Sequence, residues 1–340
     1  MKKSFLVLLL FSIISLSAYS QEKKWKVGLF PFFDNTEFSS SKVQIPQTMS
    51  GVHFSPEIGL VWDSIHSVNI GFDMLHEFGS PMSIGYFNPT AYYEFNGKPF
   101  RFYMGAFPRN IALEKYPRIF FQDSLSYYRP NVNGLFWEIR NNKNYLNVWL
   151  DWTSRQSLTA NEAFFMGFSG RYNLGIFYVQ HFGYLFHLAG KMNPVAYENL
   201  HDNGMFLTSL GVDFEGRTNF TKLETNVGWV AGLERSRTVE AGWIANQGML
   251  IETKIEYKGM GIFNSFYRGQ SQMLYYSEHG NELYWGDPVY RAKTYNRSDI
   301  YYKFIDNKIV NVSLIYSLHF LENTVYHEQA LKVILNINNF

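Results

Sequence analysis

The chain has 340 residues and a formal net charge of +1; 19% of its residues are aromatic and none is cysteine. The near-neutral charge excludes the basic face of a dedicated nucleic-acid-binding protein, and the lack of cysteine excludes disulfides as a source of stability. The aromatic content exceeds what the core of an average soluble domain requires, so we expect aromatic side chains to have a second role.

Residues 1–20 have the layout of a cleaved secretory signal. Two lysines precede an apolar run over 5–16, and the small residues Ala18 and Ser20 follow it. This run is too short for a transmembrane helix, which needs about 20 apolar residues, and no later segment is long and apolar enough either. We therefore expect a signal peptide over 1–20 and one exported domain over 21–340, either a soluble all-β protein or a membrane β-barrel.

From about residue 25 onward, apolar and polar residues alternate with a period of two in segments of roughly 9 to 13 residues. This alternation is typical of β-strands with one apolar and one polar face. The segments with the clearest alternation are 87–95, 100–106, 135–140, 222–231, 249–257 and 310–319. We predict β-strands along nearly the whole exported chain.

The connections between these segments alternate between short and long. The short ones are rich in Asn, Asp and Gly, which tolerate the positive φ of tight hairpins; they lie at 63–64, 96–98, 141–144, 173, 215–219, 258–259 and 306–308. The long ones lie at about 35–48, 78–85, 107–133, 154–162, 188–204, 232–245, 269–297 and 321–328. Together they join sixteen strands, and an even number places both termini on the side of the short turns.

This organisation resembles that of Gram-negative outer-membrane β-barrel proteins of porin-like size, which combine a signal peptide, an even number of strands, short periplasmic turns, long extracellular loops and aromatic girdles. The resemblance covers nearly the whole exported chain, and no short motif identifies a subfamily. It implies a closed antiparallel transmembrane barrel of about 16 strands, with 14–18 compatible, in the lipid of the cell outer membrane. It also implies that the barrel insertion machinery recognises the C-terminal Phe340. The apolar residues of the last strand lie at positions of the opposite parity from Phe340, which would place a bulge near Asn338 and Asn339.

A soluble propeller or large sandwich is the competing interpretation, because its strands also alternate. Three features favour the membrane barrel: strands long enough to cross a bilayer at a tilt, the alternation of connections, and the lack of a sequence repeat at a period of about 40 to 50 residues. Closure of the sheet is required in lipid because an open edge would leave backbone groups without hydrogen-bond partners.

The polar strand faces carry charges of both signs, which a dry interior would not tolerate without pairing. We expect Asp151 to lie near Arg155 and beside Glu138 and Arg140; the full expected charge ladder along the lumen is Arg101, Glu138, Arg140, Asp151, Arg155 and Arg171. In porins, opposed charged walls create a transverse field at the constriction. Mechanical stiffening of the wall is an equally open interpretation of this ladder.

The two longest loops, 107–133 and 269–297, combine charges with aromatic residues too dense to remain exposed. We expect at least one of them to fold into the barrel or over its mouth. The candidate constriction residues are Arg109, Arg118, Asp123, Arg129, Trp285, Asp287 and Arg291. Such loops also suit stacking against a saccharide, and packing of the loop on itself is the favoured alternative.

Catalytic and metal motifs give little signal. His327 and Glu328 lack the second histidine of a zinc helix, and the segment 167–171 is not a nucleophile elbow. Outer-membrane lipid hydrolases place a His and a Ser two residues apart on one strand face, and we assign no such pair. We therefore expect no catalysis, no metal and no cofactor.

The expected function is a porin-like channel for small hydrophilic solutes, without a nucleic-acid partner. Two alternatives stay open. One is a non-conducting barrel that serves surface binding or envelope assembly through its long loops, and the other is an outer-membrane hydrolase that depends on a lumen carboxylate.

Overall fold

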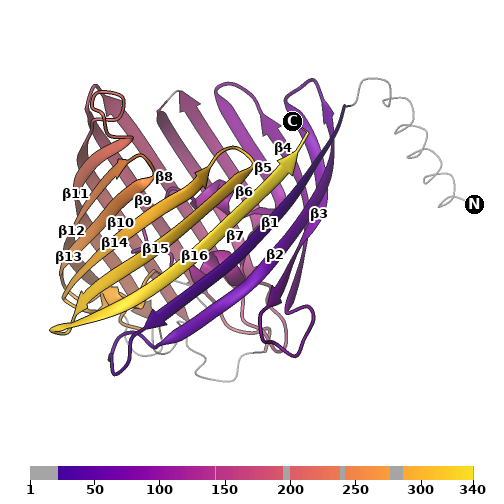
Figure 1. The fold of residues 1–340 in the computed structure, drawn as a ribbon. Helices are drawn as coiled ribbons and strands as arrows, with labels where there is room; N and C mark the ends of the chain where they lie inside the picture. Colours follow the sequence, from indigo (N-terminus) through magenta and orange to yellow (C-terminus); the bar gives the residue numbers. More distant parts are fainter. Residues whose placement is uncertain (1–21, 142, 194–199, 238–241, 276–285, 340) are drawn as a thin grey trace, which may run out of the picture.

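The computed structural model describes residues 22–141, 143–193, 200–237, 242–275 and 286–339. They form a closed antiparallel barrel in which each strand pairs with its neighbours in sequence and β1 pairs with β16 (Figure 1). The strands are β1 Glu22–Glu37, β2 Gln47–Trp62, β3 His66–Glu77, β4 Tyr86–Asn96, β5 Phe100–Pro108, β6 Asn131–Asn141, β7 Asn144–Ser154, β8 Ala163–Leu174, β9 Phe177–Leu188, β10 His201–Asp213, β11 Lys222–Ser236, β12 Ile244–Tyr257, β13 Met260–Gly269, β14 Thr294–Asp306, β15 Val310–Leu321 and β16 Thr324–Asn338. The prediction of a closed barrel of about 16 strands is confirmed.

The alternating residues of each strand lie on opposite faces of the barrel wall, as the period-two pattern predicted. Apolar side chains point outward and are exposed, among them Ile58, Ile70 and Leu210 at 68%, 59% and 69%. The intervening positions point into the barrel, where polar residues such as Asn69 and Ser169 are fully buried. An apolar outside and a polar inside are the arrangement that a bilayer requires of a transmembrane barrel.

Two parts of the predicted connection pattern are wrong. The strands β10 and β11 extend into the expected loops 188–204 and 232–245, over residues 201–204 and 232–236, because these residues pair with each other from His201–Ser236 onward. The expected long loop 321–328 is a two-residue hairpin turn in which Glu322 and Asn323 have φ of 53° and 62°. A turn of this kind needs positive φ at both central residues, and the polar composition of the segment hid the start of β16.

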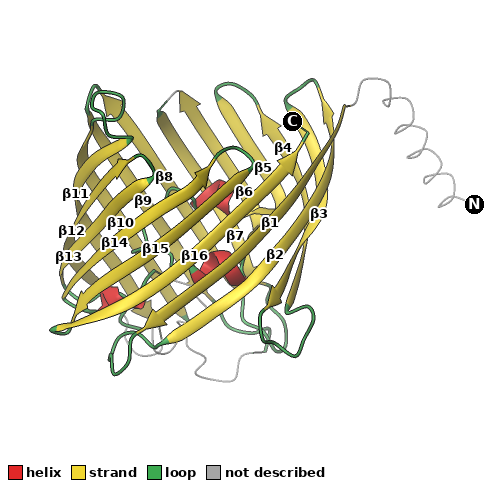
Figure 2. Cartoon of the chain, in the orientation of Figure 1, coloured by secondary structure: helices red, strands yellow, loops and turns green. Residues whose placement is uncertain are grey.

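The loop between β5 and β6 folds into the barrel, as expected for at least one long loop. It carries two short helices, α2 Asn110–Leu113 and α3 Ser124–Tyr128, which lie inside the ring of strands (Figure 2). Ile119 and Phe120 are fully buried, and the Tyr116 hydroxyl donates to the Phe168 and Gly183 carbonyl oxygens at 2.9 and 3.1 Å. The loop therefore crosses the lumen as far as β8 and β9.

The loop between β13 and β14 contributes the 3-10 helix η2 Pro288–Arg291 to the same packing. Gly286 lies so close to the backbone of Ile119 that an added Cβ would collide with the Ile119 carbonyl group. Among the residues described, no helix is both long and apolar enough to cross a bilayer.

Candidate functional site

A serine, a histidine and an aspartate meet on the inner wall of β2 and β3. The His53 Nδ1 atom lies 2.7 Å from Asp73 Oδ1, and the Ser55 hydroxyl donates to Asp73 Oδ2 at 2.5 Å. The pairs that flank this position, Phe54 with Met74 and Glu57 with Gly71, place Ser55 opposite Asp73 in the β2–β3 register. Hence one carboxylate holds both a hydroxyl group and an imidazole ring.

Aromatic packing fixes the histidine of this group. Phe30 stacks on the His53 ring with centroids 5.8 Å apart, and Phe32 lies at the same distance on a tilted plane. His53 and Asp73 are 2% and 6% exposed, and His53 Nε2 has no hydrogen-bond partner within the described residues. One ring nitrogen is thus engaged by the carboxylate, while the other is buried and is not committed to any described residue.

The three residues line a cavity of about 470 Å³ inside the barrel. Its apolar part includes Phe30, Leu113, Phe121 and Leu125, and its polar part includes the cations Lys26, Arg109, Arg118 and Lys332. The inserted loop supplies five of these eight side chains, so the cavity exists because the loop is docked. A pocket with apolar walls and a few converging polar groups is the usual form of a small-molecule site.

A second serine, histidine and carboxylate group makes an instructive contrast. His319 Nε2 lies 3.0 Å from Glu328, its Nδ1 lies 2.8 Å from the Tyr295 hydroxyl, and Ser317 accepts a hydrogen bond from Arg297 at 2.9 Å. Both nitrogens of this histidine are engaged, and none of its three residues Ser317, His319 and Glu328 lines the cavity that contains Ser55. We interpret this second group as structural, because its hydrogen bonds join neighbouring strands of the wall.

The sequence interpretation missed the first group. His53-Phe54-Ser55 is a His-x-Ser pair on one strand face, so our assignment of no such pair was wrong. The signal was present as two polar residues at period two between apolar neighbours. The partner Asp73 lies 18 residues away and joins the pair only through the register of the two strands.

An ionic network docks the inserted loop against the wall. Arg118 forms an ion pair with Asp123 and lies 3.4 Å from Asp287 and 3.5 Å from Glu328. Burial alone would lower the pKa of Arg118, but the surrounding carboxylates hold this pKa well above its usual value. Burial alone would raise the pKa of Asp123, and the charges of Arg118 and Lys332 hold it well below the usual value. Both groups are therefore charged at neutral pH.

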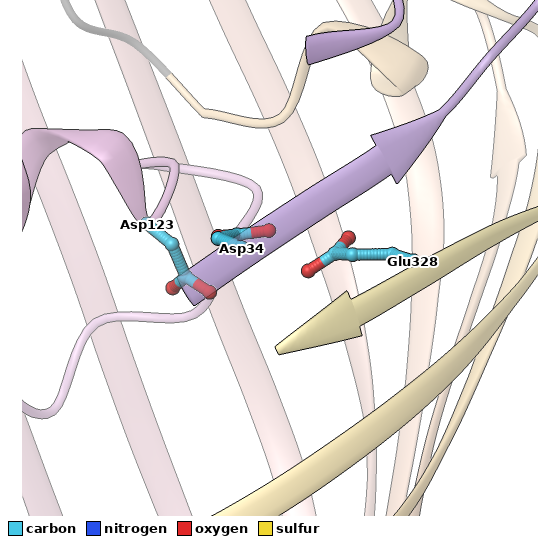
Figure 3. A group of neighbouring side chains, drawn as sticks. All are labelled: Asp34, Asp123 and Glu328. Carbon is cyan, nitrogen blue, oxygen red and sulfur yellow. The ribbon is translucent and has the colours of Figure 1, made fainter. Parts of the chain in front are cut away.

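Three carboxylates of this network approach one another closely. Asp34 on β1, Glu328 on β16 and Asp123 at the start of α3 point toward a common space (Figure 3), with candidate ligand oxygens within 4.8 Å of one another. These are the described residues that could hold a metal ion. However, Lys332 binds Asp123 at 3.0 Å and Arg297 binds Glu328 at 3.2 Å, so protein cations already balance most of this charge. We interpret the cluster as part of the ionic network.

The predicted charge ladder does not form one continuous row. Arg101 and Arg140 do flank Glu138, at 3.4 and 4.0 Å. Arg171 instead pairs with Glu224 at 2.7 Å and Asp213 at 3.1 Å, on strands β11 and β10.

The expected pairing of Asp151 with Arg155 is wrong. Arg155 lies beyond the end of β7 and is exposed. Asp151 is fully buried and binds Arg109 of the inserted loop at 2.5 Å, while its second oxygen accepts the Asn133 N–H at 2.9 Å. It also stands opposite Gly134 rather than Glu138, because the β6–β7 register sets those two carboxylates four positions apart.

The other predicted constriction residues have structural positions in the two loops. The Arg129 carbonyl accepts a hydrogen bond from Arg109 at 2.5 Å, and Arg291 ends η2 half-buried. Asp287 lies 3.4 Å from Arg118 and from Arg297, which joins the two loops to β14. Trp285, like Phe340 at the C-terminus, lies outside the described residues, as does the predicted signal peptide.

Comparisons with known proteins place this geometry in context. The model of the family described as lipid A 3'-O-deacylase-type matches residues 17–339. No curated protein matches the chain. The match contradicts our expectation that the chain is not an enzyme, since a deacylase is a hydrolase.

Solved structures show the same fold at low identity. The chain is similar to a loop-deletion mutant of OmpT, an outer-membrane protein of Vibrio cholerae, with 8% identity and a TM-score of 0.57 over 94% of this chain and 100% of that one. It is also similar to the anion-selective porin from Comamonas acidovorans, at 8% identity and 0.54, and to OccK9 from Pseudomonas aeruginosa, at 10% identity and 0.54; each comparison covers 94% of this chain and 99% of the other. The barrel is an outer-membrane protein, as the sequence predicted.

Proposed function

Because the chain belongs to the lipid A 3'-O-deacylase-type family, we propose that it is an outer-membrane hydrolase that cleaves an acyl ester of a lipid A-like substrate. The observation that carries this proposal is the Asp73 carboxylate, which binds both Ser55 and His53 at the wall of the loop-covered cavity. A hydroxyl group next to an acid–base pair is the arrangement that nucleophilic ester cleavage requires.

In the proposed reaction, Ser55 Oγ attacks the ester carbonyl carbon and its proton passes to the Asp73–His53 pair. The alcohol then leaves with that proton, and the acyl group stays on Ser55. Water hydrolyses this acyl-enzyme, which releases the fatty acid and restores the serine hydroxyl group. The buried carboxylate orients the imidazole ring and stabilises its protonated form during both steps.

The negative charge that develops on the carbonyl oxygen needs a hydrogen-bond donor. Asn88 on β4 stands opposite Asp73 in the β3–β4 register, and its buried Nδ2 has no partner among the described residues. Asn88 is therefore our candidate for this donor. The cations that line the cavity of Ser55, Lys26 and Lys332 among them, suit an anionic headgroup beside the cleaved ester.

The test is hydrolysis of lipid A by the purified, folded protein in detergent, with release of fatty acid followed by mass spectrometry. We expect Ser55→Ala to lower the rate by about 1,000-fold or more, as for the loss of a nucleophile in serine hydrolases. The matched control is Ser317→Ala, which removes a buried serine of the second group and leaves the cavity intact. Equal activity of Ser55→Ala and wild type would reject Ser55 as the nucleophile.

Passage of small hydrophilic solutes remains a second proposal. The similarity of the fold to porins supports it, but the inserted loop reaches across the lumen, with contacts to Asp34 on β1 and Phe182 on β9. Single-channel recordings that show no conductance would count against it. Binding of a saccharide or other surface partner by the outer loops stays a prediction without a contact to support it.

A further inference from the structure

The barrel wall is incomplete beside the proposed site. Hydrogen-bond pairing between β4 and β5 ends at Ala91–Ala106, although β4 begins five residues earlier at Tyr86. On its other edge, β4 stays paired with β3 as far as Tyr86. The five residues 86–90 therefore form a free strand edge that faces the end of β5, and we refer to this interruption of the wall as the β4–β5 gap.

The proline at the end of β5 is one cause of the gap. In an antiparallel strand, the N–H groups of successive residues point alternately to the two neighbouring strands. The Arg109 N–H donates to the Pro130 carbonyl at 2.7 Å, toward the β6 side, so residue 108 must face β4. Pro108 has no N–H to donate in that direction.

The residue opposite Pro108 has the same defect. Continuation of the β4–β5 register beyond Ala91–Ala106 would pair Pro108 with Pro89. The Asn96 N–H donates to Ile65 on the β3 side at 2.7 Å, so the odd-numbered residues of β4, including Pro89, face β5. Both hydrogen bonds of this pair would need a proline N–H, and neither can form. Two prolines 19 residues apart in the sequence thus prevent the hydrogen bonds that would close the gap.

The gap adjoins the cavity that contains Ser55. Thr90 from the free edge and Pro108 from the end of β5 both line this cavity. Ser55, Asp73 and Asn88 follow one another across β2, β3 and β4 at the same level, so β3 alone separates the strand of the proposed nucleophile from the strand with the free edge. Pro108 also shares the parity of the outward-facing Met104, so this residue of the wall lies between the cavity and the outer surface.

The surroundings of the gap suit a hydrocarbon chain. Phe87 and Met104 on its outer side are 58% and 56% exposed, and Phe87 packs against Phe72 with ring centroids 5.1 Å apart. At the loop end of the barrel, Tyr86 contacts Tyr128 of α3 edge-on, with ring centroids 6.0 Å apart. The inserted loop therefore covers the end of the gap that lies next to the long loops. The position in the half of the wall next to the long loops corresponds to the outer leaflet of the membrane.

We propose that the β4–β5 gap is a lateral entrance through which an acyl chain of an outer-leaflet lipid reaches Ser55 directly from the membrane. This inference rests on the proposed hydrolase function and specifies its substrate as a lipid that stays in the bilayer during the reaction. A chain that enters sideways places its ester near the wall, where Ser55 lies, and leaves the charged headgroup among the cations of the cavity. The inserted loop then need not move for the lipid to bind.

The test closes the gap with a reversible cross-link. The natural chain has no cysteine, so Pro89→Cys/Pro108→Cys gives a unique thiol pair across the gap, to be joined by a short bis-maleimide with a reducible spacer. The matched control is Ala91→Cys/Ala106→Cys, cross-linked at the last closed pair of the wall. Each protein is assayed with lipid A in vesicles and with a short-chain, water-soluble ester.

We expect the cross-link at 89 and 108 to slow hydrolysis of vesicle lipid A at least tenfold, with recovery when the spacer is reduced. The rate of hydrolysis of the soluble ester should change by less than twofold. The control cross-link should change neither rate more than twofold. Unchanged lipid A hydrolysis by the fully cross-linked 89/108 protein overturns the lateral entrance. If the wild type hydrolyses neither substrate, the proposed function fails, and the entrance is then judged by photochemical labelling alone.

That labelling uses a vesicle lipid with a photoactivatable group at the end of its acyl chain. Lateral entry predicts adducts on the cavity residues Leu113 and Phe121, reduced at least fivefold by the cross-link. Adducts restricted to the outer side chains Phe87 and Met104 would overturn it whether or not the protein is an active enzyme.

Discussion

The Arg109–Asp151 ion pair should determine whether the inserted loop stays docked. Asp151 is fully buried and Arg109 is 8% exposed, and the guanidinium also donates to the Arg129 and Asn131 carbonyls at 2.5 Å. In Asp151→Asn the side-chain shape is retained, but the buried guanidinium loses its counter-charge. Two unit charges about 4 Å apart interact by about 4 kcal/mol at an effective dielectric constant of about 20.

This magnitude agrees with the cost of removing one partner of a buried pair, about 3–5 kcal/mol. The cost falls on loop docking rather than on the barrel, because the strands remain paired without the loop. We therefore expect the undocked population of Asp151→Asn to rise by about 100-fold or more. Trypsin reports this population through Arg118, because this residue is paired with Asp123 and precedes the fully buried Ile119 and Phe120 while the loop is docked.

The measurement is the rate of loop cleavage in folded protein at low trypsin concentration. The matched control is Asp306→Asn, which breaks a half-exposed pair with Lys303 at 3.3 Å and should change the rate by less than about fivefold, because exposed pairs contribute under about 1 kcal/mol. A cleavage rate for Asp151→Asn equal to that of this control would refute the assignment of Asp151 as the docking partner.

Further predictions concern the site, the two loops and the fold. Asn88→Ala should lower kcat about 100-fold with little change in KM if its amide stabilises the developing charge, and an equal rise in KM alone would contradict that role. Because the pKa of Asp123 is held below its usual value in the docked loop, docking should be stable at neutral pH and weaken only as the pH falls below about 4, measured by the rate of loop cleavage with pepsin, which is active at acid pH. Gly286→Ala should destabilise the contact with Ile119 by about 1–3 kcal/mol in denaturant unfolding, whereas Gly242→Ala, with open space around it, should be neutral; similar values for the two would exclude the close contact. The folded barrel should migrate faster on a gel without boiling than after boiling, and a single position under both conditions would contradict a detergent-resistant barrel.

The period-two pattern by itself determined the barrel. Strands with one apolar face need lipid against that face, and in lipid an open sheet edge would leave backbone groups without hydrogen-bond partners. Closure of the sheet could therefore be predicted without knowledge of any side-chain contact. The positions of most hairpins also followed, because Asn, Asp and Gly mark the turns that need positive φ. The pattern failed at Glu322 and Asn323, where a polar stretch contains both a tight turn and the start of β16.

Only the tertiary structure decided which polar residues meet. Asp151 was expected to pair along its own strand, yet Arg109 reaches it from a loop that folds through the lumen. Ser55 and His53 could be recognised as a same-face pair in the sequence, but Asp73 joins them through the β2–β3 register, and the cavity exists because the inserted loop covers them. Local alternation fixes the face on which a side chain lies, whereas register and loop insertion fix its neighbours across the barrel, and the chemistry depends on those neighbours.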